Sequence, residues 1–402
     1  QMNAHMSSPE HNVLSIVGPV GNSALQAVGV AESIKEQPQN PFVLCSLCEG
    51  TTQESEVVEA IGHAVRENLP VLFMVQDNSF AISTKTRGQT FYSYPQGDAQ
   101  EFYGIPITRI DGRKTASAIE AFDPVIRELR ETRGPQIVIF QVERLHNHTN
   151  ADDQRLYRTP EEIDSVAQTG DPVAMLRRDL IDRGVSEEDL RSEEDAIRSG
   201  LKEDARSAQM SAEPTPMTGA AAPLPDRLRD PSVEYTGNGE RELVMLEAIR
   251  DVLDARMGTD ERVTLFGEDI EDPKGDVFGI TRGLTQKYGT RVKNSPLSES
   301  LIVGVSIGRA LTGGRPVAFL QFADFLPIAY NQIFAELGSM YWRTDGGWQV
   351  PVIVMVTAGG YRPGLGPFHA STLEALVAHT PGVDVYMPSD AGDAAGMLNA
   401  AF

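Results

Sequence analysis

Cysteine, positive charge and long apolar runs are all scarce in this sequence. Two cysteines among 402 residues, Cys45 and Cys48, are too few for a disulfide framework and favour a reducing, intracellular location. Basic residues number 35 against 57 acidic ones, and the net charge of −22 argues against nucleic acid or an anionic membrane as a partner. No uninterrupted apolar segment reaches the roughly 18 residues that a membrane-spanning helix needs.

The length and the apolar content indicate a chain of more than one domain. At 402 residues, two to three domains are expected, and an apolar fraction of 41% can bury substantial cores. Strand-like and helix-like patterns alternate over residues 1–211 and again over residues 240–402. The stretch between them, residues 212–239, is rich in proline and alanine, as is typical of a linker. We therefore predict two α/β domains joined by this linker.

The first half is organised around residues 41–83. An apolar run at 42–47 predicts a strand, and apolar residues between 57 and 64 recur at helix spacing. A second apolar run, 69–75, predicts the next strand. A strand, a helix and a second strand in this order form a βαβ unit, in which the two strands run parallel.

Polar residues follow both of these strands, at the end of a parallel sheet where ligands bind. Glu49 follows the first strand and Asn78 the second. A carboxylate, an amide oxygen and a backbone carbonyl suit Mg²⁺, which also takes phosphate oxygens, so a diphosphate ligand is expected. Gly50 lets the backbone approach that ligand, and the helix N-terminus near Thr51 favours anions. The alternative is an ordinary α/β unit with polar residues at its strand ends, because such short motifs are weak evidence.

Further elements complete the two predicted domains. In the first half, strands are expected at 13–20, 105–110 and 137–142, and helices at 24–34 and 116–130. Asp171 and Pro172 begin two charged helices that extend to about residue 210. In the second half, helices are expected at 243–255 and 302–311, and strands at 263–266, 291–300, 317–319 and 350–356.

Glu299 stands at the turn from an expected strand into an expected helix. Leu297, Ile302 and Val303 are expected to give it apolar surroundings. A carboxyl group held in that way has a raised pKa and can share a proton with a ring nitrogen. The alternative is a glutamate that the helix dipole favours at a helix start.

Residues 41–83 resemble the thiamine-diphosphate motif, a Gly-Asp/Glu-Gly turn followed further along by Asn-Asn. More closely, they resemble the α part of the decarboxylating component of 2-oxo acid dehydrogenase complexes. The resemblance implies thiamine diphosphate as the cofactor, with Mg²⁺ held by Glu49, Asn78 and the carbonyl of Phe80. It also implies that Gly50 and Thr51 contact the cofactor.

The sequence departs from the family's pattern at three positions in this motif. Cys48 replaces the first Gly and Asp77 the first Asn, and Gln76 stands where some members have a diphosphate-binding Arg. Cys48 is expected to crowd the turn, and Asp77 adds negative charge beside a diphosphate. These departures leave open a degenerate, non-catalytic homologue kept as an assembly subunit.

The resemblance extends to both sides of this motif. QM-x-x-H at the start of the chain and the following Gly-Pro resemble the entrance loop and a pyrimidine-contacting turn, which implies cofactor contacts by His5, Gly18 and Val20. Residues 143–158 resemble a loop that orders when the cofactor binds, R-x-x-x-H-x-x-x-D-D-x-x-x-Y-R, in which His148 matches the active-site histidine. Taken alone, His5 is equally well interpreted as a surface histidine, and residues 143–158 as a solvated charged loop.

Residues 240–402 resemble the pyrimidine-binding domain of the family's β part. The resemblance implies that Glu299 is the catalytic glutamate, which drives the aminopyrimidine into its imino form. His369 matches the histidine that faces the lipoyl-bearing partner. Taken alone, Phe325 would be interpreted as a core residue. Further cofactor contacts are implied at Glu268, Leu297, Gln321 and Phe325.

The resemblance covers nearly all of the chain and implies an enzyme. Such an enzyme uses thiamine diphosphate and Mg²⁺ to decarboxylate a 2-oxo acid, and passes the acyl group to the lipoyl group of an acyltransferase partner. Its fold would be two thiamine-diphosphate-binding domains, with the usually separate α and β parts fused and the C-terminal transketolase-like domain absent. The fused chain is expected to form a homodimer, in the bacterial cytoplasm or the mitochondrial matrix. Glu49 and QM-x-x-H favour the branched-chain type; an acetoin-cleaving or transketolase-like enzyme is the alternative.

Overall fold

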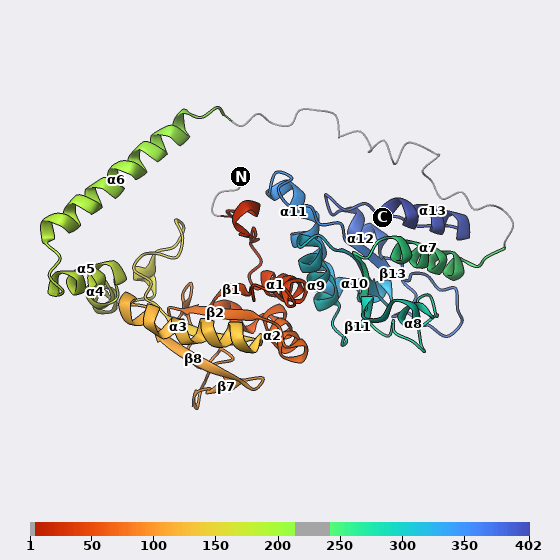
Figure 1. Ribbon diagram of the computed structural model, residues 1–402, viewed down its shortest axis with the longest axis horizontal. Helices are drawn as coiled ribbons and strands as arrows, with labels where there is room; N and C mark the ends of the chain where they lie inside the picture. Colours follow the sequence, from red (N-terminus) through yellow and green to blue (C-terminus); the bar gives the residue numbers. More distant parts are fainter. Residues whose placement is uncertain (1–4, 214–241) are drawn as a thin grey trace.

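The computed structural model describes residues 5–213 and 242–402, which form two α/β units (Figure 1). The first sheet has the strand order β1-β2-β9-β8-β7, in which β7 pairs antiparallel with β8 and the other pairs are parallel. The second sheet has the order β11-β10-β12-β13 and is parallel throughout. The predicted fold class, parallel sheets flanked by helices, is confirmed.

The strands agree with most of the apolar runs. Those of the first sheet are β1 (Val43–Cys48), β2 (Val71–Asp77), β7 (Glu101–Phe102), β8 (Ile105–Asp111) and β9 (Gln136–Gln141). Those of the second are β10 (Val263–Gly267), β11 (Val292–Asn294), β12 (Arg315–Leu320) and β13 (Ile353–Val356). Two short hairpins lie in the polar stretch after β2, and pair β3 (Phe80–Ala81) with β4 (Thr84–Lys85) and β5 (Ser93–Tyr94) with β6 (Gly97–Asp98).

Helices cover both faces of the first sheet. One face is covered by α1 (Ser23–Ile34) and α2 (Ser55–Glu67), and the other by α3 (Thr115–Thr132). The apolar residues of α2 that recur at helix spacing, Val57, Ala60, Ile61 and Ala64, are all fully buried, as that spacing predicts. The later helices α4 (Pro160–Thr169), α5 (Pro172–Asp182) and α6 (Glu187–Met210) lead away from the sheet (Figure 1).

The caps explain where two of these helices begin. Asp171 accepts hydrogen bonds from the amides of Val173 and Ala174, which confirms the predicted start of α5. The helix α4 was not expected from the sequence. Thr159 and Glu162 form a capping box at its start, a local signal that the apolar periodicity does not show.

The second sheet is also enclosed on two sides. The helix α9 (Glu299–Leu311) covers one face, and α7 (Met245–Thr259) and α13 (Ala391–Ala401) belong to the cores on the other. The remaining helices are α8 (Leu284–Tyr288), α10 (Leu326–Asn331), α11 (Gly338–Arg343) and α12 (Glu374–Ala378), with a π-helical turn η7 (Gln332–Leu337) between α10 and α11.

The two units share one hydrophobic core, which is centred on the packing of α1 against α9. A Cβ atom added at Gly304 would overlap the side chain of Leu25, and one added at Gly308 would overlap the backbone of Gln26. The two helices therefore approach so closely that only glycine fits at these positions. Leu25 of α1 and Val305 of α9 are both fully buried in this common core.

Two expected strands are wrong in whole or in part. Residues 13–20 form no strand, apart from an isolated bridge between Ser8 and Val13. The carbonyl of Ser15 instead accepts a hydrogen bond from the Arg343 side chain, so a side chain of the second unit replaces a sheet partner. The expected strand at 291–300 is reduced to β11, because the chain leaves the sheet after Asn294 and turns towards α9.

The predicted linker at 212–239 falls almost entirely outside the described residues. The division of the chain into domains at 1–211 and 240–402 therefore stays a prediction. Among the helices of residues 5–213 and 242–402, none is both long and apolar enough to cross a bilayer.

Candidate functional site

Glu49 and Asn78 meet at the carboxyl ends of β1 and β2, as the sequence predicts. The register of these strands pairs Cys48 with Gln76, so the residues that follow them are neighbours. The side-chain amide of Asn78 donates to Glu49 Oε2 at 3.2 Å, and its backbone amide lies 3.4 Å from the same oxygen. The βαβ unit thus brings together the two side chains expected at a metal site.

The charge and burial of this pair suit a cation. Glu49 is only 1% exposed, and burial raises the pKa of its carboxyl group, with the negative charge of Asp77 adding to the effect. The backbone amides of Asn78 and Phe80 oppose that rise. The amide oxygen Asn78 Oδ1 is buried and has no hydrogen-bond partner. A cation with oxygen ligands would satisfy this oxygen and stabilise the buried carboxylate.

The donor set fits Mg²⁺ rather than a metal that prefers nitrogen or sulfur. Within residues 5–213 and 242–402, no cluster of three or more His, Cys, Asp and Glu side chains is arranged to hold a metal. A site with one carboxylate and one amide oxygen needs phosphate oxygens or waters to complete its shell, as Mg²⁺ commonly does. The residues present therefore fit Mg²⁺ together with a diphosphate.

The turn after β1 is tightly packed. A Cβ atom at Gly50 would lie 2.7 Å from the Cβ of Ala81, so the backbone here approaches the next segment closely. Thr51 is buried, and its hydroxyl lies 2.7 Å from the Cys48 thiol. Cys48 itself is exposed, and this contact places its thiol directly against the turn.

The other two departures from the family's pattern occupy different surroundings. Gln76 is exposed and donates to the Ser46 hydroxyl at 3.1 Å. Asp77 accepts from the amide of Ser79 at 2.8 Å and lines a cavity of about 100 Å³. Tyr92 lies on the same cavity, and burial raises the pKa of its hydroxyl, with the charge of Asp77 adding to the rise. Asp77 therefore brings negative charge close to Glu49.

Acidic side chains also gather where the second unit meets α2. Glu268 follows β10 and is 2% exposed, and Glu299 is the first residue of α9 and is 9% exposed. Ser298 links this end to the first unit: its amide donates to Glu268 Oε1 at 3.2 Å, and its hydroxyl donates to Glu59 Oε2 at 2.7 Å. Glu59, on α2, was not expected from the sequence, because a glutamate on an amphipathic helix is usually solvated.

Burial raises the pKa of two of these acids, Glu268 and Glu59. It raises the pKa of Glu268 to about 7, and the charge of Glu299 adds to the rise. Burial also raises the pKa of Glu59, with Glu56 and Glu299 adding their charges and the Ser298 hydroxyl opposing them. The Glu268 carboxyl can therefore hold and release a proton near pH 7.

The expected surroundings of Glu299 are only partly correct. Ile302 and Val303 of the same helix are fully buried, but Leu297 is 85% exposed and does not enclose the carboxyl. The carboxyl groups close enough to feel the charge of Glu299 are those of Glu59 and Glu268, and this charge raises the pKa of both. The turn 295–298 faces the other unit, and that location could not be inferred from residues adjacent in sequence.

The structure brings several of the other expected residues together in the second unit. The Gln321 side chain donates to the carbonyl of Glu268 and accepts from the amide of Val277 at 3.2 Å. Phe325 is half-buried, and its ring centroid lies 5.5 Å from that of His369, whose side chain is exposed. The four expected residues Glu268, Gln321, Phe325 and His369 therefore lie around the carboxyl end of this sheet.

Polar residues of the loop at 143–158 hold it together and place it against the turn that follows Asn78. Arg144 donates to the Tyr157 hydroxyl at 2.7 Å and to the carbonyl of Ile82 at 2.8 Å, and its guanidinium lies 5.5 Å from the ring centroid of Phe80. His148 is exposed, and its backbone amide donates to Asp152 at 2.8 Å. The loop as a whole thus contacts the turn that follows Asn78.

The expected contacts of the N-terminal segment stay predictions. Gly18 and Val20 are exposed and immediately precede α1. His5 is half-buried, and the Gln-Met of the QM-x-x-H pattern lies outside the described residues.

Comparison with known families gives matches over both halves. The model of the dehydrogenase E1 component family matches residues 1–217. The model described as transketolase, pyrimidine binding domain, matches residues 241–402.

The curated relatives include β subunits of three enzymes. The 2-oxoisovalerate dehydrogenase subunit beta of Bacillus subtilis is 41% identical over 157 residues, which is 39% of this chain and 47% of the relative. The pyruvate dehydrogenase E1 component subunit beta of the same organism is 39% identical over 160 residues, 39% of this chain and 48% of the relative. The acetoin:2,6-dichlorophenolindophenol oxidoreductase subunit beta of Cupriavidus necator is 36% identical over 168 residues, 39% of this chain and 49% of the relative. The chain thus spans about half the length of these relatives.

Proposed function

This chain belongs to the dehydrogenase E1 component family, and from that membership we propose that it acts in the oxidative decarboxylation of a 2-oxo acid with thiamine diphosphate and Mg²⁺. The acyl group would pass to the lipoyl group of an acyltransferase partner. We further propose that a homodimer of fused chains carries out the reaction in the cytoplasm, or in the mitochondrial matrix if the source is a eukaryote.

The observation that carries this proposal is the placement of two kinds of polar site against one helix. The turn with Glu49 leads directly into α2, and Glu59 on α2 bonds to Ser298 beside the acids of the second unit. The proposed metal-diphosphate site therefore lies just before α2, and the proposed proton-exchanging acids meet the same helix at Glu59, across the interface between the units. A cofactor with a diphosphate at one end and a titratable ring at the other fits such an interface.

The roles of the chain's own residues follow from their chemistry. Glu49, Asn78 and the carbonyl of Phe80 would hold Mg²⁺, and Gly50 and Thr51 would face the diphosphate. Glu299, beside Glu268, would exchange a proton with a ring nitrogen through a carboxyl oxygen. Thiamine diphosphate, when bound, supplies the carbanion chemistry of decarboxylation. His148 and His369, both exposed, are proposed to act where the substrate and the lipoyl group approach.

The substrate class is proposed from the relatives and from the sequence. Relatives are named for 2-oxoisovalerate and for pyruvate, and the features at Glu49 and QM-x-x-H favour a branched-chain 2-oxo acid. Acetoin is the second candidate, because one relative at 36% identity is an acetoin oxidoreductase subunit. The third is the non-catalytic assembly subunit that Cys48, Asp77 and Gln76 leave open.

Two measurements separate these candidates. Calorimetric titration with thiamine diphosphate, in the presence and absence of Mg²⁺, tests for the cofactor; Mg²⁺-dependent binding is expected, and no binding supports the assembly subunit. Reduction of an artificial electron acceptor is then followed with 3-methyl-2-oxobutanoate, pyruvate and acetoin as separate substrates. Turnover with the branched-chain 2-oxo acid above the other two supports the proposal, and turnover with acetoin alone contradicts it.

A further inference from the structure

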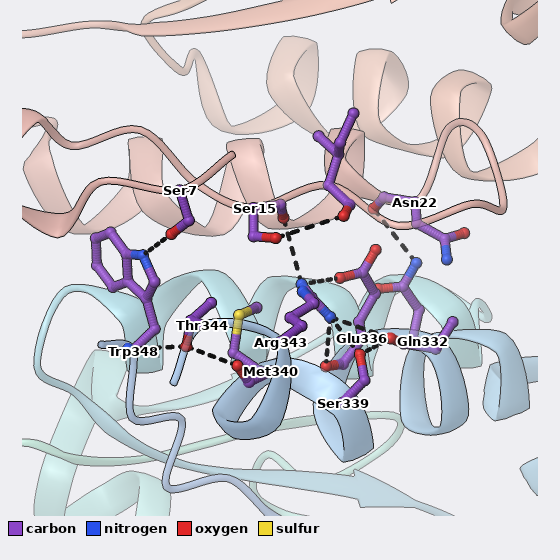
Figure 2. Close-up of polar contacts among 12 residues, drawn as sticks. Ser7, Ser15, Asn22, Gln332, Glu336, Ser339, Met340, Arg343, Thr344 and Trp348 are labelled. Carbon is purple, nitrogen blue, oxygen red and sulfur yellow. Dashed lines mark hydrogen bonds and ion pairs between the residues drawn. The ribbon is translucent and has the colours of Figure 1, made fainter. Parts of the chain in front are cut away.

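The segment 7–22, which precedes α1, lies along the second unit and is held there by side chains of η7 and α11 (Figure 2). Its own backbone offers little to fix its course, since the chain here forms one short 3-10 turn and one isolated bridge. Its position therefore depends on contacts with the other unit. This segment contains Gly18 and Val20, both expected to contact the cofactor.

Arg343 is the centre of these contacts. Its guanidinium donates to the Glu336 carboxylate at 2.6 Å, in a pair whose side chains are both 1% exposed. The same guanidinium donates to the carbonyls of Ala335 and Glu336 and to the hydroxyl of Ser339, all within its own helical segment. These bonds fix the orientation of the guanidinium before it meets the N-terminal segment.

The Arg343 nitrogen that donates to the Glu336 carboxylate also reaches the segment. Its Nη2 atom donates to the carbonyl of Ser15 at 3.3 Å (Figure 2). Ser15 is 1% exposed, so its carbonyl would be buried without a partner if this donor were absent. Charge-assisted bonds to a buried carbonyl are among the stronger hydrogen bonds in proteins.

Two further contacts hold the ends of the segment. Trp348 donates from its ring nitrogen to the Ser7 hydroxyl at 2.9 Å, and Gln332 donates to the carbonyl of Asn22 at 3.3 Å (Figure 2). Asn331 also bonds to the Asn22 side chain at 2.7 Å and to Glu56 on α2 at 3.1 Å. The segment is thus attached at its start, its middle and its end, and the middle contact is the charged one.

We propose that Arg343, oriented by Glu336, is a positioning residue that fixes the segment 7–22 on the second unit and thereby places the Gly18–Val20 turn at the cofactor. The anchoring of the segment does not depend on what the protein binds. The effect on the cofactor rests on the proposed function. The two parts are therefore tested by separate measurements.

The anchoring is tested by hydrogen exchange at residues 8–17 in the intact chain without added cofactor. Arg343→Lys keeps a charge beside Glu336, but a single ammonium group cannot replace two nitrogens. In the parent, Nη1 donates to the carbonyls of Ala335 and Glu336, while Nη2 donates to the Glu336 carboxylate and to Ser15. We expect exchange at residues 8–17 to become roughly tenfold faster or more. Arg343→Met, which removes the charge, should show a larger effect if it folds; if it does not, Arg343→Lys decides the question.

The control is Met257→Ala, a cavity in the core of the second unit that does not touch the segment. Met257 is 1% exposed and belongs to the core between α7 and the second sheet. It should lower the melting temperature without a selective increase of exchange at residues 8–17. The anchoring would be overturned if hydrogen exchange at residues 8–17 were as slow in Arg343→Lys as in the parent. It would also be overturned if Met257→Ala sped up exchange there as much as Arg343→Lys does.

The effect on the cofactor is measured as the dissociation constant of thiamine diphosphate in the presence of Mg²⁺. Arg343→Lys should weaken binding by about tenfold, the scale expected when a supporting residue lets a site loosen, and Met257→Ala should leave it within about twofold. Faster exchange with unchanged affinity would overturn the positioning of the cofactor turn. If the parent chain binds no thiamine diphosphate, the proposed function fails, while the exchange experiment still decides the anchoring.

Discussion

Asn78 is the residue that most directly indicates a cation beside Glu49, because its side-chain oxygen has no hydrogen-bond partner. Buried polar atoms in folded proteins nearly always have partners, and this one lies next to a carboxyl group that is itself almost fully buried. Burial and Asp77 both work against ionisation of Glu49. A bound cation would stabilise the ionised Glu49 against both effects and would give the Asn78 oxygen a partner.

We predict that Glu49→Ala or Asn78→Ala abolishes Mg²⁺-dependent binding of thiamine diphosphate and leaves the fold intact. Each variant removes one of the oxygen ligands that the site offers. Calorimetric titration measures the loss, and circular dichroism checks the fold. Glu120→Ala, an exposed position on α3, is the matched control and should bind as the parent does. Unchanged affinity in either site variant would remove the metal assignment.

Glu299 differs from the proposed metal ligands because its proposed role is to exchange a proton. We predict that Glu299→Gln binds thiamine diphosphate normally yet loses turnover by a factor on the order of 10² or more, since an amide cannot take up and return the proton. Affinity and decarboxylation rate are measured side by side. Glu261→Gln, an exposed position in the same unit, serves as the control. A Glu299→Gln variant that turns over at close to the parent rate would contradict the assignment.

Glu268 gives a pH dependence whose sign follows from its raised pKa. The folded state holds the proton up to about pH 7, whereas an unperturbed glutamate carboxyl has a pKa of 4.5. This carboxyl therefore contributes stability below about pH 4.5 that is lost as the pH rises through 7.

As the pH rises from 4.5 to above 7, we expect the free energy of unfolding of the parent to decrease relative to that of Glu268→Gln. The expected decrease is on the order of 2–3 kcal/mol. Denaturant unfolding at several pH values measures the difference. Parallel pH curves for the parent and the variant would show that Glu268 titrates normally.

At the scale of elements, the contact between α1 and α9 is what joins the two units. We predict that Gly308→Ala destabilises the chain by about 1–3 kcal/mol, because the added methyl group overlaps the backbone of α1 and forces the helices apart. Gly200→Ala is the matched control: it lies on the exposed helix α6, where a Cβ meets nothing within 4 Å. It should leave stability unchanged or raise it by up to about 1 kcal/mol. Thermal unfolding of both variants tests this, and equal effects would contradict the close packing.

At the scale of the whole molecule, buried charges join the units as well as apolar packing. Glu32 on α1 lies 2.6 Å from Arg309 on α9 and 2.9 Å from His63 on α2. Burial alone would raise the pKa of Glu32, but Arg309 and His63 together hold it well below its usual range. The carboxylate therefore stays ionised and paired across the interface.

We predict that proteolytic cleavage within residues 214–241 leaves the two halves associated and active in the intact protein. The shared core and the Glu32–Arg309 pair do not depend on the linker. Size-exclusion chromatography before and after cleavage measures the association. Arg309→Met, which leaves the Glu32 charge buried with fewer partners, should weaken it in the cleaved protein. Separation of the cleaved parent into inactive halves would show that the linker itself is required.

The sequence by itself determined most of the strands, several of the helices, and the meeting of Glu49 and Asn78. Strand ends of a βαβ unit are neighbours by geometry, so Glu49 and Asn78 were placed together by the order of apolar runs alone. The helical spacing in α2 and the cap of α5 were local signals of the same kind.

Only the tertiary structure decided what depends on the interface between the units. Residues 13–20 look like a strand because they are apolar, but their partner is Arg343, far away in sequence. Glu59 looks like a solvated helix residue, but Ser298 and the acids of the second unit meet it. Periodicity reports how much of a side chain is buried and not what buries it, so contacts across an interface become known only when both sides are in place.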